Sequence, residues 1–260
     1  GGEAGQGMGN AAGAAGARQW NRWGDGLEAP AAGERPFFQQ GWTPARSVAD
    51  AMAVFGHSAA QVQHAMERGE AIARCKLQVI NIKVAPAKVA AVFAYTQEDP
   101  KLYADLNKAC RTPGGHWDAL LAQYRDYLYH LRSATNALPN FVGTAYRGSS
   151  ELACAAAYQV GERITWQQFT STSKQLRVAV RFLRKQGGDF GGALFVLEIN
   201  DGKEVELCSD FPDEEEVLLG LNSHFRVAAK AETKEAKLAM VPLLKGYDVS
   251  DLTVLRLEQL

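Results

Sequence analysis

The sequence lacks an excess of charge of either sign, and it lacks any long apolar run. Its 28 Lys and Arg residues nearly balance its 29 Asp and Glu residues, which leaves a formal net charge of −1. A strong positive field is what draws a protein to nucleic acid or to an anionic membrane, so we expect neither as a partner. A helix that crosses a bilayer needs roughly 20 consecutive apolar residues, and no stretch approaches that length.

Cysteine and histidine are sparse and dispersed. The four cysteines form no CxxC pair, and the five histidines form no HExxH motif. We therefore expect no metal site. The even number of cysteines fits two disulfides in a secreted protein, and it fits free thiols in a cytosolic protein equally well. The cysteines are Cys75, Cys110, Cys154 and Cys208.

The N-terminal part differs in composition from the rest. Residues 1–17 are dominated by Gly and Ala, and such a segment buries too little apolar surface to offset the entropy lost on ordering. Residues 19–42 hold several Trp and Phe residues among Pro and Gly without periodicity, so we expect them to pack irregularly on the domain surface. The predicted organisation is an N-terminal segment, residues 1–42, followed by one folded domain, residues 43–260.

Apolar periodicity predicts a helical first half and a β-rich second half. Helical spacing covers most of residues 44–138, with Ser58 as an N-cap and Pro86 at a helix start, apart from a β-branched run at 77–84 that predicts a strand. Short extended runs then dominate, interrupted by one helix at 173–185. They are 144–147, 168–173, 193–199, 204–207, 215–219, 225–228, 238–243 and 253–257. Since strands and helices do not alternate regularly, the predicted class is α+β.

Two segments of the β half carry side chains suited to an anionic ligand. Arg147 ends a predicted strand and is followed by Gly148, so a planar fork of donors stands where the backbone lets a diphosphate approach closely. The alternative is a surface arginine beside a turn. Residues 169–173 read Phe-Thr-Ser-Thr-Ser, and an ordinary strand edge is the alternative for this run of hydroxyls.

A third segment contains three adjacent glutamates ahead of an apolar run. If this segment enters a strand, alternate side chains share a face, so Glu214 and Glu216 project together while Glu215 points away. Two like charges on one face make each other better proton acceptors, as a catalytic base requires. A solvated acidic turn is the alternative for the triplet on its own.

The order of these segments resembles that of the arginine-directed mono-ADP-ribosyltransferases, which include bacterial toxins, type III effectors and vertebrate ectoenzymes. The three motifs follow one another in the family's order: an Arg at one strand end, Ser-Thr-Ser in the next strand, and Glu-x-Glu before a third strand. The similarity covers roughly residues 90–230. Its other parts are Ala94-Tyr95-Thr96, Leu102-Tyr103, Leu106-Asn107, Arg111 and Phe225-Arg226-Val227. The resemblance implies an ADP-ribosyltransferase fold, with a helical N-terminal half followed by a mixed β-sandwich core around an NAD cleft.

The resemblance also implies an activity. NAD would be a substrate, no metal would be needed, and ADP-ribose would pass to an arginine side chain of a target protein. Arg147 would hold the NAD phosphates, and Ser171 would orient the catalytic carboxylate. Glu216 would be that carboxylate and would stabilise the positive charge that builds as the glycosidic bond breaks. Glu214 would contact the incoming guanidinium and help to remove its proton.

Further positions carry over from the same resemblance. Gly148 and Thr172 complete the set that contacts NAD. Phe182 occupies the place of an aromatic ring that stacks on nicotinamide, and Arg184 or Lys185 that of a phosphate ligand; the alternative for Phe182 is a core aromatic. Phe211 stands at the aromatic position of the loop that presents the first glutamate, where it would recognise the target protein or serve as a hydrophobic staple.

Two other functions stay open. An NAD glycohydrolase would use water in place of the guanidinium, and Glu214 argues for transfer because hydrolysis needs only Glu216. A catalytically silent protein of this fold would act by binding. The feature that suggests this function is the segment with Arg18, Trp20, Arg22 and Trp23, which would occlude the NAD cleft.

The expected setting is a secreted bacterial effector that acts in the host cytoplasm. The Gly/Ala-rich N-terminal segment lacks the basic region followed by an apolar region that a signal peptide has, and this favours the effector setting. The chain opens on Gly1, which is compatible with a leader that has been removed. The cysteine count keeps an extracellular or cell-surface enzyme open.

Overall fold

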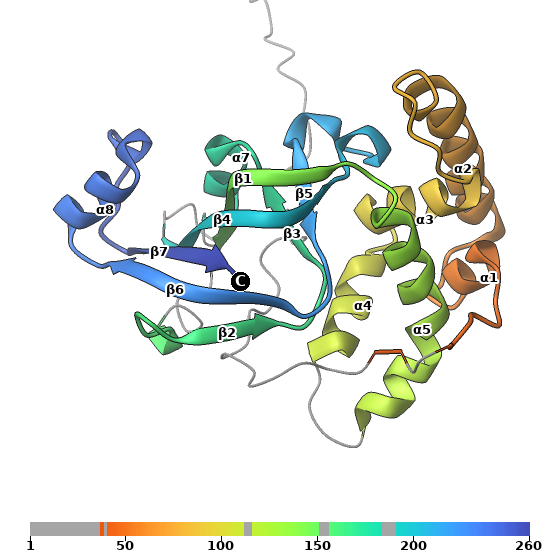
Figure 1. Cartoon of the computed structure of the whole chain (residues 1–260), viewed down its shortest axis with the longest axis horizontal. Coiled ribbons are helices and arrows are strands. Elements are labelled where there is room, and N and C mark those ends of the chain that lie inside the picture. Colours follow the sequence, from red (N-terminus) through yellow and green to blue (C-terminus); the bar gives the residue numbers. More distant parts are fainter. Residues whose placement is uncertain (1–36, 39–40, 112–115, 151–155, 184–190) are drawn as a thin grey trace, which may run out of the picture.

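The structure is a computed structural model that describes residues 37–260 except 39–40, 112–115, 151–155 and 184–190; the side chains of 116–121 are also left out. The helices of the first half gather at one end of the molecule and the strands of the second half at the other (Figure 1). The predicted α+β class is confirmed. None of the helices in the described ranges has both the length and the apolar character that crossing a membrane requires.

The helical half starts its helices with the expected capping residues. The helices are α1 (Val48–Ala53), α2 (Ala59–Ile72), the π-helical turn η1 (Ala73–Leu77), α3 (Pro86–Thr96), α4 (Leu102–Arg111) and α5 (His116–Thr135). Ser58 and Gln61 form a capping box, since the Ser58 Oγ accepts from the Gln61 N–H at 3.3 Å and the Gln61 Oε1 accepts from the Ser58 N–H at 2.9 Å. Pro86 fills the first turn of α3, where its missing N–H costs nothing.

Helix α3 is the centre of the helical half, because every residue from Val89 to Thr96 is buried. Tyr127 of α5 fixes this helix from one side: its hydroxyl donates to the Ala91 carbonyl oxygen at 2.6 Å. Burial raises the pKa of Tyr127 well above its ordinary value. The hydroxyl therefore stays a donor, and α3 and α5 are held together by a polar contact inside an apolar core.

The described end of the N-terminal segment packs against α5. Phe38 and Trp42 lie with their ring centroids 5.8 and 5.6 Å from the ring of Tyr129, and the Arg132 guanidinium stands 4.4 Å from the Phe38 ring centroid. Phe37 goes deeper than the predicted surface packing, since it is 3% exposed within the helical core. The apolar core thus includes a residue from the segment placed before the domain.

The second half is a mixed sheet folded into two layers. Its strands are β1 (Asn140–Ser149), β2 (Arg163–Trp166), β3 (Thr170–Ser173), β4 (Gly192–Glu204), β5 (Glu216–Leu219), β6 (Ser223–Ala231) and β7 (Leu252–Gln259). They are hydrogen-bonded in the order β1-β3-β5-β4-β7-β6-β2, with β4 and β7 parallel, and β1 pairs with β4 as well. Because β1 pairs with β4 along most of its length and with β3 at one residue pair, β3 and β5 fold over the layer β1-β4-β7-β6-β2.

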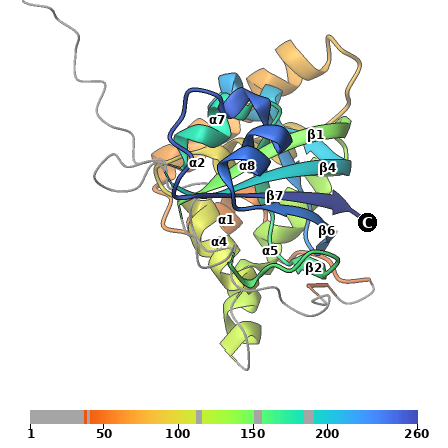
Figure 2. The same ribbon diagram turned by 90° about the vertical axis from the view of Figure 1, so that its left-hand side faces the viewer.

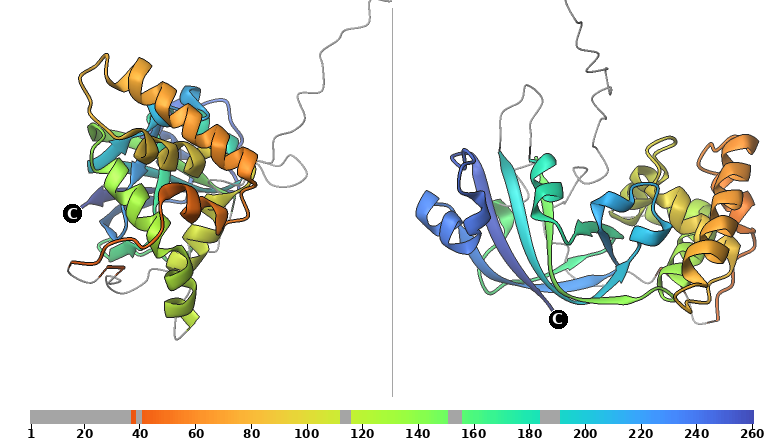
Figure 3. Two further views of the ribbon diagram at one scale, coloured as in Figure 1. Left: turned by 90° about the vertical axis from the view of Figure 1, so that its right-hand side faces the viewer. Right: turned by 90° about the horizontal axis from the view of Figure 1, so that it is seen from above.

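An apolar core fills the space between these layers, as a sandwich requires. Val217 and Leu219 of β5 join Phe195 of β4 and Phe225 of β6 in this cluster. The other face of the larger layer packs against α7 (Leu176–Arg181) and α8 (Lys234–Met240), which lie together over it in Figure 2. Seen from above in Figure 3, α8 stands at the end of the molecule opposite the helical half.

The strand predicted at 77–84 is wrong. The chain instead continues α2 through η1 and then turns. Val79 and Ile80 are 78% and 52% exposed, so the β-branched run has no sheet to join. A strand exists only where a neighbouring strand completes its hydrogen bonds.

The strands predicted at 204–207 and 238–243 are also wrong. Strand β4 ends at Glu204. The Val205 N–H still donates to the carbonyl oxygen of Glu216, and the chain then enters the 3-10 turn η2 (Glu206–Cys208). At 238–243, Thr233 caps α8 by accepting from the Ala236 N–H at 3.3 Å. Strand β2 is absent from the prediction.

Candidate active site

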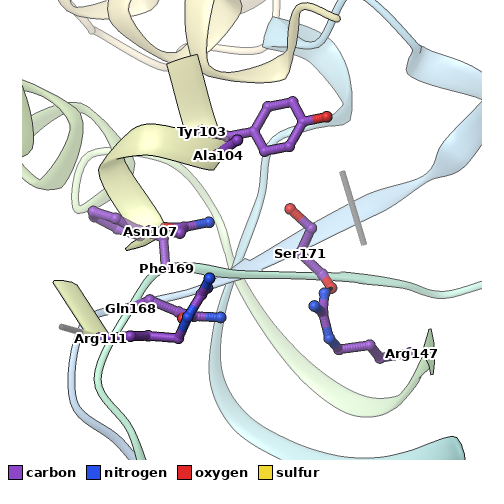
Figure 4. A pocket seen from close by; sticks show the side chains of 8 residues that line it. All are labelled: Tyr103, Ala104, Asn107, Arg111, Arg147, Gln168, Phe169 and Ser171. Carbon is purple, nitrogen blue, oxygen red and sulfur yellow. Dashed lines mark hydrogen bonds between the residues drawn. The ribbon is translucent and has the colours of Figure 1, made fainter. Parts of the chain in front are cut away.

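A pocket opens between helix α4 and strands β1 and β3, where the helical half meets the sheet half (Figure 4). The cavity is small, about 10 Å³. Its lining comprises Tyr103, Ala104, Asn107 and Arg111 of α4, Arg147 of β1, and Gln168, Phe169 and Ser171 in and before β3. Two of the residues that the sequence assigned to the NAD site, Arg147 and Ser171, are therefore brought together here.

Arg147 forms the sheet side of this pocket and is 3% exposed. Its Nη1 donates to the carbonyl oxygen of Ser171 at 2.8 Å, and in Figure 4 its guanidinium is directed toward Ser171. The backbone of Arg147 is itself held opposite Phe195 of β4. Strand pairing thus fixes this positive charge in a buried place, where its field is screened less by water.

Helix α4 supplies the opposite side of the pocket. The Arg111 Nη1 donates to the Gln168 Oε1 at 2.6 Å, which places a second guanidinium among the lining residues. Asn107 is 8% exposed and its Nδ2 donates to the Tyr95 hydroxyl at 3.0 Å. The other amide atom of Asn107, Oδ1, is buried and has no hydrogen-bond partner in the described part of the chain. A buried acceptor beside a polar pocket suits a ligand that brings an N–H or O–H donor.

The Ser-Thr-Ser strand β3 pairs antiparallel with β5, the strand that starts with the last glutamate. Ser171 lies opposite Leu218, and Ser173 lies opposite Glu216. Because side chains alternate along a strand, Ser171, Ser173, Glu216 and Leu218 share one face. Leu218 belongs to the helical core, so this face is turned toward the helical half. Glu216, 0% exposed, therefore lies on the same side of the sheet as Ser171.

The three glutamates are arranged by a turn and not by strand alternation. Glu214 ends the 3-10 turn η3 (Pro212–Glu214), and Glu215 has the left-handed angles φ 45°, ψ 50°. The prediction that Glu214 enters a strand is therefore wrong, because β5 begins only at Glu216. Glu214 and Glu216 are nonetheless both buried, at 5% and 0% exposure, while Glu215 is half-buried.

The loop that leads to these glutamates is fastened to the end of α3. The Thr96 Oγ1 accepts from the Asp210 N–H at 2.9 Å, and the Ser209 Oγ accepts from the Phe211 N–H at 3.0 Å. Phe211 is half-buried. Burial raises the pKa of the Cys208 thiol to about 12, against the smaller opposing effect of the Lys76 charge. Cys208 is therefore protonated at neutral pH and packs as an apolar side chain.

The remaining predicted positions lie apart from the lining of this pocket. Thr172 is on the other face of β3, where its Oγ1 donates to the Val217 carbonyl oxygen at 2.7 Å. A side chain at Gly148 would come within 2.0 Å of the Ala179 carbonyl oxygen, so this glycine lets α7 pack closely on β1. Phe182 is buried at 4% exposure in a cluster with Val178. Arg184 and Lys185 lie outside the described residues, as do Arg18, Trp20, Arg22 and Trp23.

Several side chains at the site were given no role from the sequence. Tyr103, Asn107 and Arg111 are spaced four residues apart, which puts three polar side chains on one face of α4. This spacing of polar residues is visible in the sequence and could have indicated the binding face of the helix. Ser173 and Gln175, which contact the glutamate turn, gave no such signal, because their partners are some 40 residues away in sequence.

Within the residues described, no group of three or more His, Cys, Asp or Glu side chains could hold a metal ion. Cys75, Cys110 and Cys208 are free cysteines, the first exposed and the other two buried. Cys154 lies in the range that is not described.

Comparison with known proteins places these features in one family. A family model described as NAD:arginine ADP-ribosyltransferase matches residues 56–243. The putative NAD(+)–arginine ADP-ribosyltransferase Vis of Vibrio splendidus (strain 12B01) is 31% identical over 140 residues, which are 52% of this chain and 56% of that protein. The chain spans about half the length of the curated relatives it matches.

Solved structures share the fold. The type III effector XopAI from Xanthomonas axonopodis pv. citri has a TM-score of 0.59 at 17% identity, over 82% of this chain and 81% of that one. The Vis toxin in complex with agmatine has a TM-score of 0.52 at 23% identity, over 80% of this chain and 89% of that one. At these identities the likeness concerns the fold.

Proposed function

Since the chain belongs to the NAD:arginine ADP-ribosyltransferase family, we propose that it cleaves NAD and transfers the ADP-ribose to an arginine side chain of a target protein. NAD is a substrate in this reaction, and no metal takes part. The observation that carries the proposal is the joining of the three motifs. Arg147 is hydrogen-bonded to Ser171, and strand register puts Glu216 on the same face as Ser171.

The two arginines of the pocket are suited to the diphosphate of NAD. Arg147 comes from the sheet and Arg111 from α4, and planar guanidinium groups match phosphate oxygens with paired donors. The buried Oδ1 of Asn107 would accept from an N–H or O–H of the same ligand. The space between α4 and the sheet is smaller than whole NAD, so the pocket would take one portion of the molecule.

Glu216 acts on the ribose that carries nicotinamide. The bond between the ribose anomeric carbon and the nicotinamide nitrogen breaks, its electron pair leaves with neutral nicotinamide, and positive charge builds on the ribose. A carboxylate buried at 0% exposure stabilises that charge more strongly than one in water would. Ser171, on the same face, is the positioning residue for this carboxylate.

Glu214 decides which nucleophile attacks the ribose. An arginine guanidinium is protonated and must lose a proton as its nitrogen bonds to the anomeric carbon, and Glu214 accepts that proton. Water needs no such partner beyond Glu216, so hydrolysis is the competing outcome. Phe211, half-buried three residues before Glu214, is suited to contact the target protein.

The test uses agmatine, a small molecule with a guanidinium group, and labelled NAD. Glu216→Gln keeps the size of the side chain and is expected to abolish nicotinamide release, by at least about 100-fold. Glu214→Gln is expected to lose labelled agmatine while it still releases some nicotinamide. Asp213→Asn, on the exposed neighbour in the same turn, is the matched control and should behave as wild type.

The outcome distinguishes the candidate functions. Release of free ADP-ribose by the wild type, with no label on agmatine or on any protein, would establish an NAD glycohydrolase and overturn the transferase. Absence of both products, in a protein that binds NAD, would favour a silent binding protein.

We further propose that the protein is a secreted bacterial effector that acts on an arginine of a host protein in the host cytoplasm. The support is its fold likeness to a type III effector and to a toxin, and the free thiols of Cys75, Cys110 and Cys208. Fusion of the full-length protein to a cytoplasmic reporter would test delivery, and loss of signal in a secretion-deficient strain is the expected result.

A further inference from the structure

The turn between Glu214 and Glu216 has a backbone conformation that its sequence does not favour. Glu215 has φ 45° and ψ 50°, the left-handed region that residues other than Gly, Asn and Asp rarely adopt. Such a conformation persists only where the surroundings determine it. At this place it reverses the chain so that the carboxylates before and after it are both buried, at 5% and 0% exposure.

Three consecutive residues hold this turn from outside, namely the last serine of the Ser-Thr-Ser run and the two residues that follow it. The Gln175 Nε2 donates to both carboxylate oxygens of Glu215, at 2.9 and 3.0 Å. The Lys174 N–H donates to the Glu215 carbonyl oxygen at 3.2 Å. The Ser173 Oγ donates to the Glu214 carbonyl oxygen at 2.7 Å and accepts from the Gln175 N–H at 2.9 Å. Gln175 is thus held at two points, through its backbone N–H by Ser173 and through its side-chain amide by Glu215.

The two flanking glutamates are not anchored equally. Glu216 is the first residue of β5, paired with Ser173, and its carbonyl oxygen accepts from the Val205 N–H at 3.1 Å. Glu214 belongs to a 3-10 turn of three residues. If the turn is loosened, Glu216 keeps its place in the sheet, whereas the direction of Glu214 changes.

We propose that Gln175 and Glu215 form a positioning pair that sets the direction of Glu214 relative to Glu216, and so the ratio of transfer to hydrolysis. The inference rests on the proposed function, because it concerns the choice between guanidinium and water at the same site. The hydrogen bond is charge-assisted, which makes it stronger than one between two neutral groups. Glu215, the middle residue of the motif, thereby gains a role although it does not face the substrate.

The test is an exchange of the two partners. Gln175→Glu sets two carboxylates against each other and is expected to lower the rate of agmatine labelling about tenfold, with nicotinamide release changed by less than about twofold. Glu215→Gln leaves two amides that can still bond, so its effect should be smaller. The double variant Gln175→Glu with Glu215→Gln restores an amide and a carboxylate with roles exchanged, and the wild-type ratio should return.

The control is Gln259→Ala. The Gln259 Oε1 accepts from the N–H groups of Asn200 and Asp201, each at 2.8 Å, so the variant removes a turn-holding amide outside the site, and it should leave the ratio of labelling to nicotinamide release unchanged. Thermal unfolding of each variant checks that it is folded.

An unchanged ratio in Gln175→Glu, a parallel loss of both activities, or a double variant that stays as impaired as the single one would each overturn the positioning role. Wild type without any labelling would refute the proposed function itself, which is a separate result.

Discussion

The two walls of the pocket are built in different ways. On the helical wall, side chains are held by other side chains: Asn107 by the Tyr95 hydroxyl and Arg111 by Gln168. On the sheet wall, the side chains stand on strands whose backbones are paired, and even the Arg147 guanidinium is bonded to a backbone oxygen. The first arrangement adjusts by rotation of side chains, whereas the second moves only if strands separate.

This difference separates binding from chemistry. Groups that stabilise a transition state must be in place before charge develops, and the cost of holding them is met by the fold. Groups that grip the ends of a flexible substrate gain from adjustment. We therefore expect substitutions on the sheet wall to lower kcat and substitutions on the helical wall to raise KM for NAD.

The largest effect is expected at Arg147. Arg147→Lys keeps the charge but loses the planar fork and the bond to the Ser171 carbonyl oxygen. We expect kcat for nicotinamide release to fall about 100- to 1,000-fold, in the range found for loss of a fixed charge-stabilising donor. Steady-state nicotinamide release measures it. The control is Arg226→Lys, at an exposed ion pair with Glu258, which should change the rate of nicotinamide release little. Equal effects of the two substitutions on that rate would show that Arg147 has no specific role in the reaction.

Gly148→Ala should disrupt the sheet wall through a steric clash, without removing any polar group. The new methyl group would lie 2.0 Å from the Ala179 carbonyl oxygen, so α7 must move off β1. We expect the free energy of unfolding to fall by about 3 kcal/mol. Urea denaturation is the measurement. The control is Gly220→Ala, where a methyl group meets nothing within 4 Å. Similar denaturation midpoints for the two variants would show that α7 moves away from β1 without a loss of stability.

Arg111→Lys tests the helical wall. Loss of the bidentate geometry should raise KM for NAD about tenfold, equivalent to about 1.4 kcal/mol, with kcat changed by less than about twofold. If kcat falls and KM stays constant, the helical wall takes part in the chemical step and the division between the walls fails.

The smallest effect concerns pH and the helical half. His57 is 5% exposed, and burial lowers its pKa below the ordinary 6.5, despite opposing contributions from the Met52 backbone and the Asp99 charge. The unfolded chain therefore binds a proton more readily than the folded one, so stability is complete above pH 6.5 and is lost as pH falls below it. Unfolding midpoints from pH 7.5 to pH 5 should drop less in His57→Gln than in wild type. Parallel curves would contradict this.

The sequence predicted the helical half better than the β half. Ser58, Pro86 and the apolar stripes are local signals, because helical hydrogen bonds and caps join residues three or four apart. Strand β2 and the false strands at 77–84 and 238–243 depend on whether a distant segment supplies a partner, which no local pattern contains.

The site shows the same division. Arg147, Ser171 and Glu216 were found from the order of their motifs, and the structure brings the strands that carry them together. The relation of Glu214 to Glu216 was predicted for the wrong reason, since a left-handed residue and not strand alternation buries both. Ser173, although part of the Ser-Thr-Ser motif, has no role assigned from the sequence, and Gln175 is not singled out, because only their contacts with Glu214 and Glu215 reveal what they do.

Strands β1, β3, β5 and β4 are each paired to the next, and β4 is paired back to β1. Strands β3 and β5, which carry Ser171 and Glu216, therefore each have a paired neighbour on both sides, although β3 meets β1 at one residue pair only. Local unfolding should spare them, and their amide protons should be among the last to exchange with solvent. Helix α4 is not part of this closed set of paired strands. If the proposed reaction takes place here, we expect product to leave by brief openings of the helices while Ser171 and Glu216 stay in place.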